Sequence, residues 1–400
     1  MAWRNIWRNK MRSLIIILSI ALGLFAGISV LGLYKGMMRS RVRNVIDAEQ
    51  SHLQIHDPNF KKDYDPKFIL FNGHSVLKTI DALPQVKASS PRSITNGMLA
   101  TASGSSGVQI NGVVPDREYI TSQLAAKIVE GRSFDPSRRN QVIVGRKLAN
   151  KMRLKPGSKL VLTFTDTAGN LVSGAFRVAA VYRSSNAPLD EKNVYVTISD
   201  LDNLLNIPGK FHEIAILLKN DEDVELVQHL LRQKFPGYQI ENWREISPET
   251  DLLIKTTDQY SYIIIIIVML ALAFGIINTM LMAIIERARE IGMMMALGTS
   301  RIRIFLLIVV ETILITITGT PIGILAGWLV VGYFHIHGLN VSGMGREMIS
   351  SFGFGTIIYP DFPIEKLPGV LLIVTSTALI SSLFPSIKAL RLQPAEALTR

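Results

Sequence analysis

The sequence predicts an integral membrane α-helical protein with four transmembrane helices and a large extracytoplasmic α+β domain between helices 1 and 2. Two observations support this fold class. The mean hydropathy of the 400 residues is +0.28, and the apolar residues are concentrated in blocks. A helix that rises about 1.5 Å per residue needs roughly 20 apolar residues to cross the hydrocarbon core. One such block precedes residues 51–250, which have mixed α and β patterns, and three follow them.

The apolar blocks are long enough to span a membrane. They comprise residues 13–33, 261–285, 304–332 and 368–390. Serine, threonine and proline in the last block are tolerated where neighbouring helices satisfy the polar groups. The basic residues 1–12 resemble the start of a signal peptide, but the following apolar run is longer than a signal sequence needs and lacks a small-residue cleavage site. We therefore expect the first span to be retained.

Positive charge indicates the orientation. Basic residues flank the spans at Arg4, Arg8, Lys10 and Arg12, at Arg287, Arg289, Arg301 and Arg303, and at Lys388, Arg391 and Arg400. With four spans these flanks share one side, which the positive-inside rule makes cytoplasmic. We expect a multi-pass protein of the cell inner (cytoplasmic) membrane with both termini in the cytoplasm. Much of the net charge of +11 lies in these flanks, so nucleic acid is not an expected partner.

The predicted spans divide the chain into three regions. Residues 1–50 hold the N-terminal cytoplasmic flank, the first transmembrane helix and its extension, because residues 34–50 lack proline and lack glycine after Gly36. Residues 51–255 form the extracytoplasmic domain, and residues 256–400 hold transmembrane helices 2–4. Residues 333–367 are rich in glycine and read as a loop.

The extracytoplasmic region alternates between strand and helix patterns. Apolar spacing predicts helices at 74–83 and 223–235. Strands are predicted at 92–102, 107–115, 140–145, 158–166, 171–184, 192–198 and 211–219. The stretch TDTAGNLVSG indicates a hairpin with AGN as its turn. Strand density over about 130–200 predicts a β-rich subdomain inserted into a β-α-β subdomain.

A short charged segment, ERAREIGMMMALGTSRIRIF, lies between the second and third spans. Ile284, Ala288, Ile291 and Met295 fall on one helical face, while the charged residues 286, 287, 289 and 290 fall on the other. Gly298 suits the left-handed residue that ends a helix, and Thr299 or Ser300 can cap the next one. We expect a short amphipathic helix at the cytoplasmic interface, with its charges facing outwards toward lipid headgroups or toward another protein.

The pattern E-R-x-x-E-I-G-x-x-x-A-L-G in this segment resembles the signature of the FtsX/MacB-type ABC transporter permease family. Its positions are Glu286, Arg287, Glu290, Ile291, Gly292, Ala296, Leu297 and Gly298. The opening AWRNIWRNKMRSLIIILSIALG and the end PSIKALRLQPAEAL are similar to the same family, as is the order of the elements. The resemblance covers essentially the whole chain, and within the family it is greatest to lipoprotein-releasing permeases.

The resemblance implies a mechanism and a set of partners. The eight signature residues would form a cytoplasmic coupling helix at 285–300 that docks on a separate cytoplasmic ABC ATPase dimer. That ATPase would bind ATP and Mg, so no cofactor is expected in this chain. A second permease subunit, the same or paralogous, and membrane lipids are further implied partners. The domain at 51–255 would be periplasmic and would handle its cargo outside the membrane.

We expect the cargo to be lipoproteins, released from the inner membrane toward a periplasmic carrier. A lipid would enter between spans one and two, with Leu31, Leu33, Met37, Tyr262, Ile263 and Ile266 as candidate contacts. Three alternatives stay open: export of peptides, antibiotics or toxins with a periplasmic adaptor, signalling to cell-wall hydrolases without transport, and a receptor without an ATPase.

The sequence offers no catalytic chemistry of its own. It has no G-x-x-x-x-G-K-[ST], H-E-x-x-H or G-x-S-x-G motif and no cysteine. The pairs His52/His56 and His335/His337 lack a third ligand nearby in sequence. We therefore expect no enzyme activity, no catalytic residue and no metal site.

Small residues predict how the spans pack. Gly23 and Gly27 lie four apart in the first span, and Gly319, Gly323 and Gly327 repeat at the same spacing in the third. Such rows let helix backbones approach closely, either within the chain or between two permease subunits. The spans carry almost no charge, and the exception is Glu311. We expect Glu311 to pair with Arg303 or with a basic group on another helix.

Overall fold

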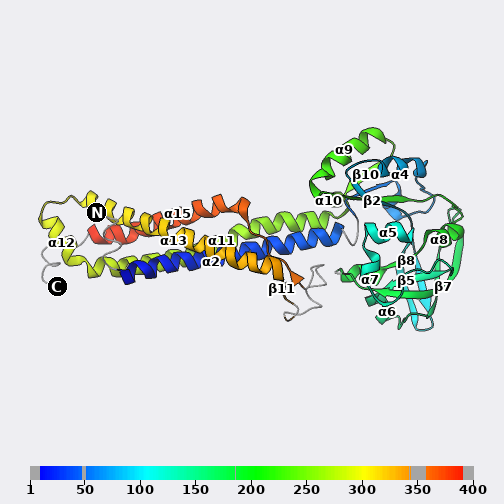
Figure 1. Ribbon diagram of the computed structural model, residues 1–400, viewed down its shortest axis with the longest axis horizontal. Helices are drawn as coiled ribbons and strands as arrows, with labels where there is room; N and C mark the ends of the chain where they lie inside the picture. Colours follow the sequence, from blue (N-terminus) through cyan, green and yellow to red (C-terminus); the bar gives the residue numbers. More distant parts are fainter. Residues whose placement is uncertain (1–9, 47–50, 185, 342, 344–356, 391–400) are drawn as a thin grey trace. The chain divides into compact units, whose positions relative to one another are not determined.

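The computed structural model describes residues 10–46, 51–184, 186–341, 343 and 357–390 (Figure 1). The chain folds into two compact units. The helical unit comprises Met1–Met38, Leu253–Asn340 and Ile357–Arg400, and the outer domain comprises Arg39–Leu252 and Val341–Thr356. Two predicted features lie outside the described residues. They are the basic flank around Arg4 and Arg8, and the last part, from Arg391 onwards, of the C-terminal segment that resembles the permease family.

Among the described residues, four helices are long and apolar enough to cross a membrane, which confirms the four predicted spans. They are α2 (Lys10–Val45), α11 (Pro248–Glu286), α13 (Arg301–His337) and α15 (Leu367–Leu390). Three of them extend well past the apolar runs, because the backbone hydrogen bonds that sustain a helix do not depend on side-chain polarity. The predicted extension of the first span is helical as far as Val45, and the first residues of the segment predicted as a loop from 333 belong to α13.

Glycines bring α2 and α13 together. A Cβ atom placed on Gly323 would lie 2.7 Å from the Cβ of Leu24 and 2.8 Å from the carbonyl oxygen of Ala21. A Cβ on Gly319 would lie 3.1 Å from the carbonyl oxygen of Ile17, and one on Gly327 would lie 2.8 Å from Cγ2 of Ile28, both in α2. The row therefore faces a helix of its own chain, where the missing side chains allow backbone contact.

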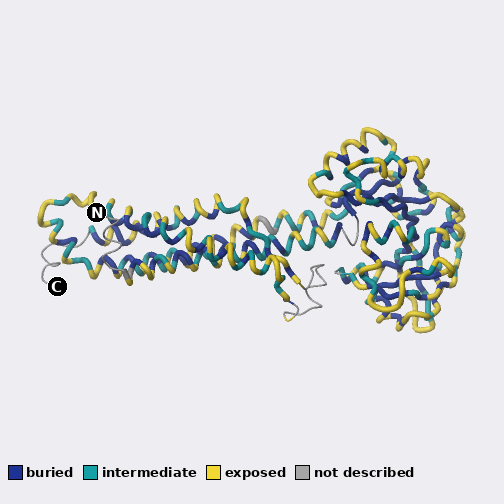
Figure 2. Tube along the Cα trace, in the orientation of Figure 1, coloured by how far each residue is buried: buried dark blue, intermediate teal, exposed yellow. Residues whose placement is uncertain are grey.

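The glycines of α2 face a different helix. A Cβ on Gly23 would collide with Leu272 of α11, whereas one on Gly27 would lie 3.9 Å from Val268, an ordinary contact. The four spanning helices share one apolar core, and Figure 2 shows exposed residues on their outer sides. Two short strands, β11 (Leu339–Asn340) and β12 (Ile357–Ile358), and the turn η5 (Ile364–Lys366) connect α13 to α15.

The outer domain is built on one sheet of ten strands in the described part of the chain. Its order is β10-β1-β9-β2-β3-β8-β5-β7-β4, with β6 paired to β2 and β7. The strands are β1 (Leu53–His56), β2 (Val86–Thr101), β3 (Gly104–Val113), β4 (Ile128–Gly131), β5 (Gln141–Gly145), β6 (Lys159–Thr165), β7 (Leu171–Tyr182), β8 (Asn193–Thr197), β9 (Glu213–Leu218) and β10 (Gln239–Asn242). Pairs β3–β8 and β5–β7 are parallel and the other ladders are antiparallel.

Short helices pack on the sheet and lie in the connections between its strands. They are α3 (Phe60–Asp63), α4 (Gly73–Asp81), α5 (Pro115–Thr121), α6 (Arg146–Lys151), α7 (Ala187–Lys192), α8 (Ile198–Leu205), α9 (Val224–Lys234) and α10 (Trp243–Ile246), with the 3₁₀ turns η2 (Leu124–Lys127) and η3 (Asp221–Asp223). The predicted helices at 74–83 and 223–235 correspond to α4 and α9.

The long strand β2 joins two hydrophobic cores. Its first half pairs with β9 and its second half with β3 and β6. One core contains residues of β1, α4, β9 and α9, and the other extends from Leu99 to Ile207. The second core thus begins earlier than the predicted insert at about 130, because β2 and β3 continue the same sheet into it.

Candidate functional site

The segment between α11 and α13 forms a helix, α12 (Ala288–Ala296). Arg287 stands alone between α11 and α12 with φ −97° and ψ 10°. Its amide donates to the carbonyl of Ala283 at 3.2 Å, and its carbonyl accepts from Ile291 at 2.9 Å. The chain therefore changes direction at Arg287 while these backbone hydrogen bonds persist.

Gly298 ends α12 as predicted. Its φ is +88°, a left-handed conformation that glycine adopts without steric cost. The Thr299 amide donates to the Met294 carbonyl at 2.9 Å, and the Gly298 amide donates to the Met295 carbonyl at 3.1 Å. This pair of bonds is the Schellman motif, which satisfies carbonyls at the end of the helix. Ser300 then occupies the N-cap position of α13.

The eight signature residues fall on two faces of this segment. Glu286, Ala296, Leu297 and Gly298 are exposed, and Leu297 has 87% of its surface accessible. Ile291 and Gly292 are buried against the helical core, and Glu290 is half-buried. The segment therefore has an anchored face and a presented face, and the signature supplies residues to both.

Arg287 corrects the expectation that the charges of this segment face outwards. Its Nη1 donates to Oε1 of Glu311 at 3.0 Å and to Oε2 at 3.2 Å, and each side chain is only 12% exposed. Glu311 thus has a basic partner from outside its own helix, and that partner is Arg287 rather than Arg303. Sequence spacing does not identify this pair, because 24 residues and a reversal of the chain separate the two.

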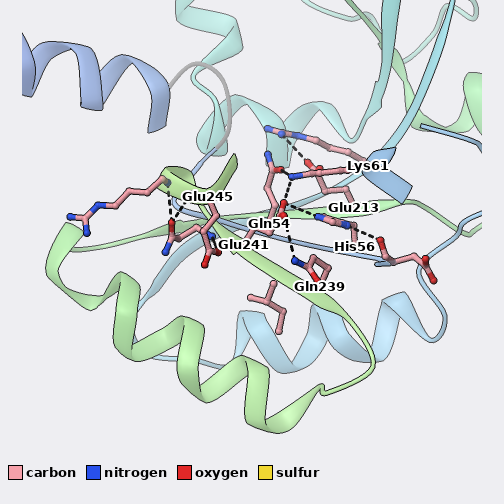
Figure 3. Close-up of polar contacts among 12 residues, drawn as sticks. Gln54, His56, Lys61, Glu213, Gln239, Glu241 and Glu245 are labelled. Atoms are coloured by element: carbon pink, nitrogen blue, oxygen red, sulfur yellow. Dashed lines mark hydrogen bonds and ion pairs between the residues drawn. The ribbon is translucent and has the colours of Figure 1, made fainter. Parts of the chain in front are cut away.

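The outer domain contains a second group of polar side chains, beside β1 (Figure 3). His56 Nε2 lies 3.1 Å from Oε2 of Glu241, and Lys61 Nζ donates to the same oxygen at 2.8 Å. Lys61 also donates to Gln54 at 2.6 Å. The hydrogen bond from His56, together with Lys61, lowers the pKa of Glu241 to about 2.

A buried ion triad connects the same sheet to α5. Arg92 contacts Glu118 at 2.7 Å and Glu213 at 3.4 Å. Burial opposes ionisation of Glu118, but Arg92 overcomes that effect and lowers the pKa of the carboxyl group. The first group links β1 to β10, and the triad links β2 to β9 and to α5. No cluster of three or more potential metal ligands occurs among the described residues.

Four candidate spanning helices, a large β-rich domain between the first two and a short helix between the second and third are the architecture of a multi-pass membrane protein of the permease class. Residues 13–234 match the MacB-like periplasmic core domain family, and residues 262–394 match the FtsX-like permease C-terminal family. The chain belongs to the MacB/FtsX-type ABC transporter permeases.

Curated relatives match the chain along its length. An ABC transporter permease of Methanocaldococcus jannaschii is 24% identical over 421 residues, covering 99% of this chain and 96% of the relative. The macrolide export ATP-binding/permease protein MacB of Escherichia coli is 22% identical over 413 residues. That alignment covers 100% of this chain, which spans 60% of the length of MacB.

Solved structures are similar to the outer domain. The periplasmic region of MacB from Actinobacillus actinomycetemcomitans aligns with a TM-score of 0.37 and 14% identity, over 52% of this chain and 95% of that one. The extracellular domain of the ABC-type transporter YknZ from Gram-positive bacteria aligns with a TM-score of 0.34 and 13% identity. The alignment covers 48% of this chain and 99% of that one.

Proposed function

We propose that this chain is the permease subunit of an ATP-driven transporter of the inner membrane, and that a separate cytoplasmic ATPase dimer docks on α12. The presented face of α12 carries this proposal. Met293 and Leu297 are 49% and 87% exposed at a turn between two spans, beside the charges of Glu286 and Arg289. Exposed apolar side chains on a short amphipathic helix suit a groove on a partner protein.

We propose further that the transporter moves its cargo by conformational change outside the membrane. Several buried hydroxyls of the described spans bond within their own helix: Thr312 and Thr316 donate to backbone carbonyls four residues earlier, as does Ser386, whereas the hydroxyls of Ser29 and Ser381 are buried without a hydrogen-bond partner. Glu311 is paired with Arg287. Ionisable side chains inside a span commonly mark a path for an ion or a polar solute, so the pairing of Glu311 favours mechanical transmission over a pore.

Lipoproteins are the cargo that we propose. Tyr262, Ile263 and Ile266 of α11 are each about half exposed, and they offer apolar surface to an acyl chain. Leu31, which we expected beside them, is buried with only 3% of its surface accessible, so α2 contributes less of this surface than expected. We propose that an acylated cargo, once extracted from the membrane, is released to a periplasmic carrier.

Export with a periplasmic adaptor is the second candidate. The similarity to MacB favours it, because it covers the whole of this chain and the name of that protein states macrolide export. Under this alternative α12 would have the same role, and only the cargo and the outer partner would differ.

Co-purification tests the proposal. The tagged full chain is extracted from its native membrane in mild detergent, and mass spectrometry identifies the proteins that accompany it. We expect an ABC ATPase together with a lipoprotein, whereas an adaptor protein would favour the export alternative. If crosslinked samples contain no ATPase, the proposed function is wrong.

A further inference from the structure

The ion pair between Arg287 and Glu311 is more buried than the pair between Lys35 and Glu365 in the same helical unit. Both side chains are 12% exposed, and Arg287 reaches both carboxylate oxygens. By contrast, Lys35 contacts Glu365 at 2.9 Å near the start of α15, but the Glu365 side chain is 70% exposed. An exposed pair of that kind contributes little to stability, whereas breaking a buried pair leaves an uncompensated charge.

Mostly apolar side chains surround the buried pair. Met280 and Ile284 of α11, Ile291 of α12, and Ile304 and Ile308 of α13 line the small cavity around Arg287 and Glu311. The half-buried Glu290 of α12 lines the same cavity. These apolar residues also belong to the core of the helical unit. Charges are costly to leave unpaired in such surroundings, so the two groups remain together.

The pair fastens the beginning of α12 to α13. The end of α12 is already connected to α13 through the short turn from Leu297 to Ser300. Ile291, in the middle of α12, packs in the same core as Ile304 and Ile308. Both ends and the middle of α12 are therefore attached to α13. α11 leads into α12 through the single non-helical residue Arg287, across which the backbone hydrogen bonds to Ala283 and from Ile291 continue.

We propose that Arg287 and Glu311 are positioning residues that lock α12 onto α13, so that the two helices move as one body when a partner displaces α12. The inference rests on the proposed function only for the identity of that partner. The lock assigns different roles within the signature: Leu297 is presented to the partner, and Arg287 transmits the displacement to the third span.

Spin labels on the full chain in lipid nanodiscs test the lock without the partner. The sequence has no cysteine, so Met293→Cys on α12 and Ile317→Cys on α13, which are 49% and 60% exposed, provide two specific label sites. We expect a narrow distance distribution by electron paramagnetic resonance. Glu311→Gln should broaden it and shift its maximum, and the exchange Arg287→Glu with Glu311→Arg should restore it.

A second variant separates loss of the lock from misfolding. Arg287→Gln combined with Glu311→Gln removes both charges of the pair, so neither partner is left as an uncompensated charge, and we expect the same broadened distribution. Glu365→Gln is the matched control, because it breaks an exposed ion pair near the start of α15 and should leave the distribution narrow. A wild-type distribution in the double glutamine variant would overturn the proposal.

The complex with the co-purified ATPase supplies the functional readout. Labels at Leu270→Cys on α11 and Ile317→Cys on α13 should report an ATP-dependent shift in distance. In the double glutamine variant we expect loss of the shift in those complexes that contain the ATPase, with the shift measured per mole of bound ATPase. Persistence of the shift would refute the lock. Absence of any ATPase would refute the proposed function, while the measurement in nanodiscs would still test the lock.

Discussion

At the scale of single residues, the outer domain relies on buried polar groups whose ionisation depends on their surroundings. Glu241 is ionised easily because His56 and Lys61 bind it. Asp202 has the opposite environment: burial raises its pKa to about 7, and the hydrogen bond from Ser93 at 2.5 Å only partly offsets this. The two carboxylates therefore affect stability with opposite signs as the pH changes.

We predict that Asp202→Asn stabilises the outer domain at pH 8 by roughly 2–4 kcal/mol. The folded pKa of about 7 lies above the unfolded value of 3.8, so the native state binds the extra proton between these values. Stability conferred by wild-type Asp202 therefore falls as the pH rises through this window, and asparagine avoids the loss. Hydrogen exchange of β2 and α8 in the full chain, corrected for intrinsic rates, measures the gain, which should shrink toward pH 4. An equal gain at both pH values would contradict the argument.

Gly298 gives a conformational prediction. A Cβ at this position meets no atom within 4 Å, so the cost of Gly298→Ala comes only from its φ of +88°. The substitution should destabilise the turn by about 1–2 kcal/mol, so we expect faster hydrogen exchange of the amides at the end of α12. Gly275→Ala in α11 is the matched control, because its Cβ also has open space and its φ is not positive. Similar exchange in the two variants would contradict the assignment of the turn.

At the scale of elements, local patterns predicted those parts of the fold whose side chains alternate clearly. The predicted strands at 92–102 and 171–184 correspond to β2 and β7, and the hairpin turn at Gly169 has φ +85°. The sequence did not reveal β1, since its four residues are buried on both faces and include Gln54 and His56. Those polar residues are buried because Lys61 and Glu241 bind them, which depends on distant parts of the chain.

The candidate site shows the same limit. The turn at Gly298 follows from local chemistry, and the sequence predicted it. The inward direction of Arg287 depends on Glu311, a residue of the following helix, so helical periodicity placed it on the wrong face. The sequence did offer one signal, because Glu311 is a single acidic residue in an apolar span. It indicated that a basic partner was needed but did not identify that partner.

The α2–α13 contact gives a prediction for an element. Gly323→Ala would bring a Cβ to 2.7 Å from the Cβ of Leu24, so we expect a loss of about 1–3 kcal/mol and a lower melting temperature of the full chain in detergent. Gly332→Ala, on the same helix but with open space, should leave the melting temperature near that of wild type. Equal melting temperatures for the two variants would show that the close contact does not form.

At the scale of the whole molecule, an even number of spans predicts that both ends of the chain share one side of the membrane. The arginines around α12 predict, by the positive-inside rule, that this side is the cytoplasm. In right-side-out membrane vesicles, a membrane-impermeant maleimide should label Leu171→Cys in the outer domain and spare Arg289→Cys in α12. Both positions are exposed, so the reverse pattern would show that the orientation is wrong.

If an ATPase docks on α12, two matched variants of the permease should differ in how much of that ATPase they capture. Leu297→Glu changes an apolar residue that is 87% exposed at the end of α12, and Ile336→Glu changes one that is 76% exposed in the last turn of α13. We predict that Leu297→Glu loses the ATPase per mole of purified permease, while Ile336→Glu retains it at the wild-type level. Equal capture by both variants, at equal yields of folded permease, would contradict the account.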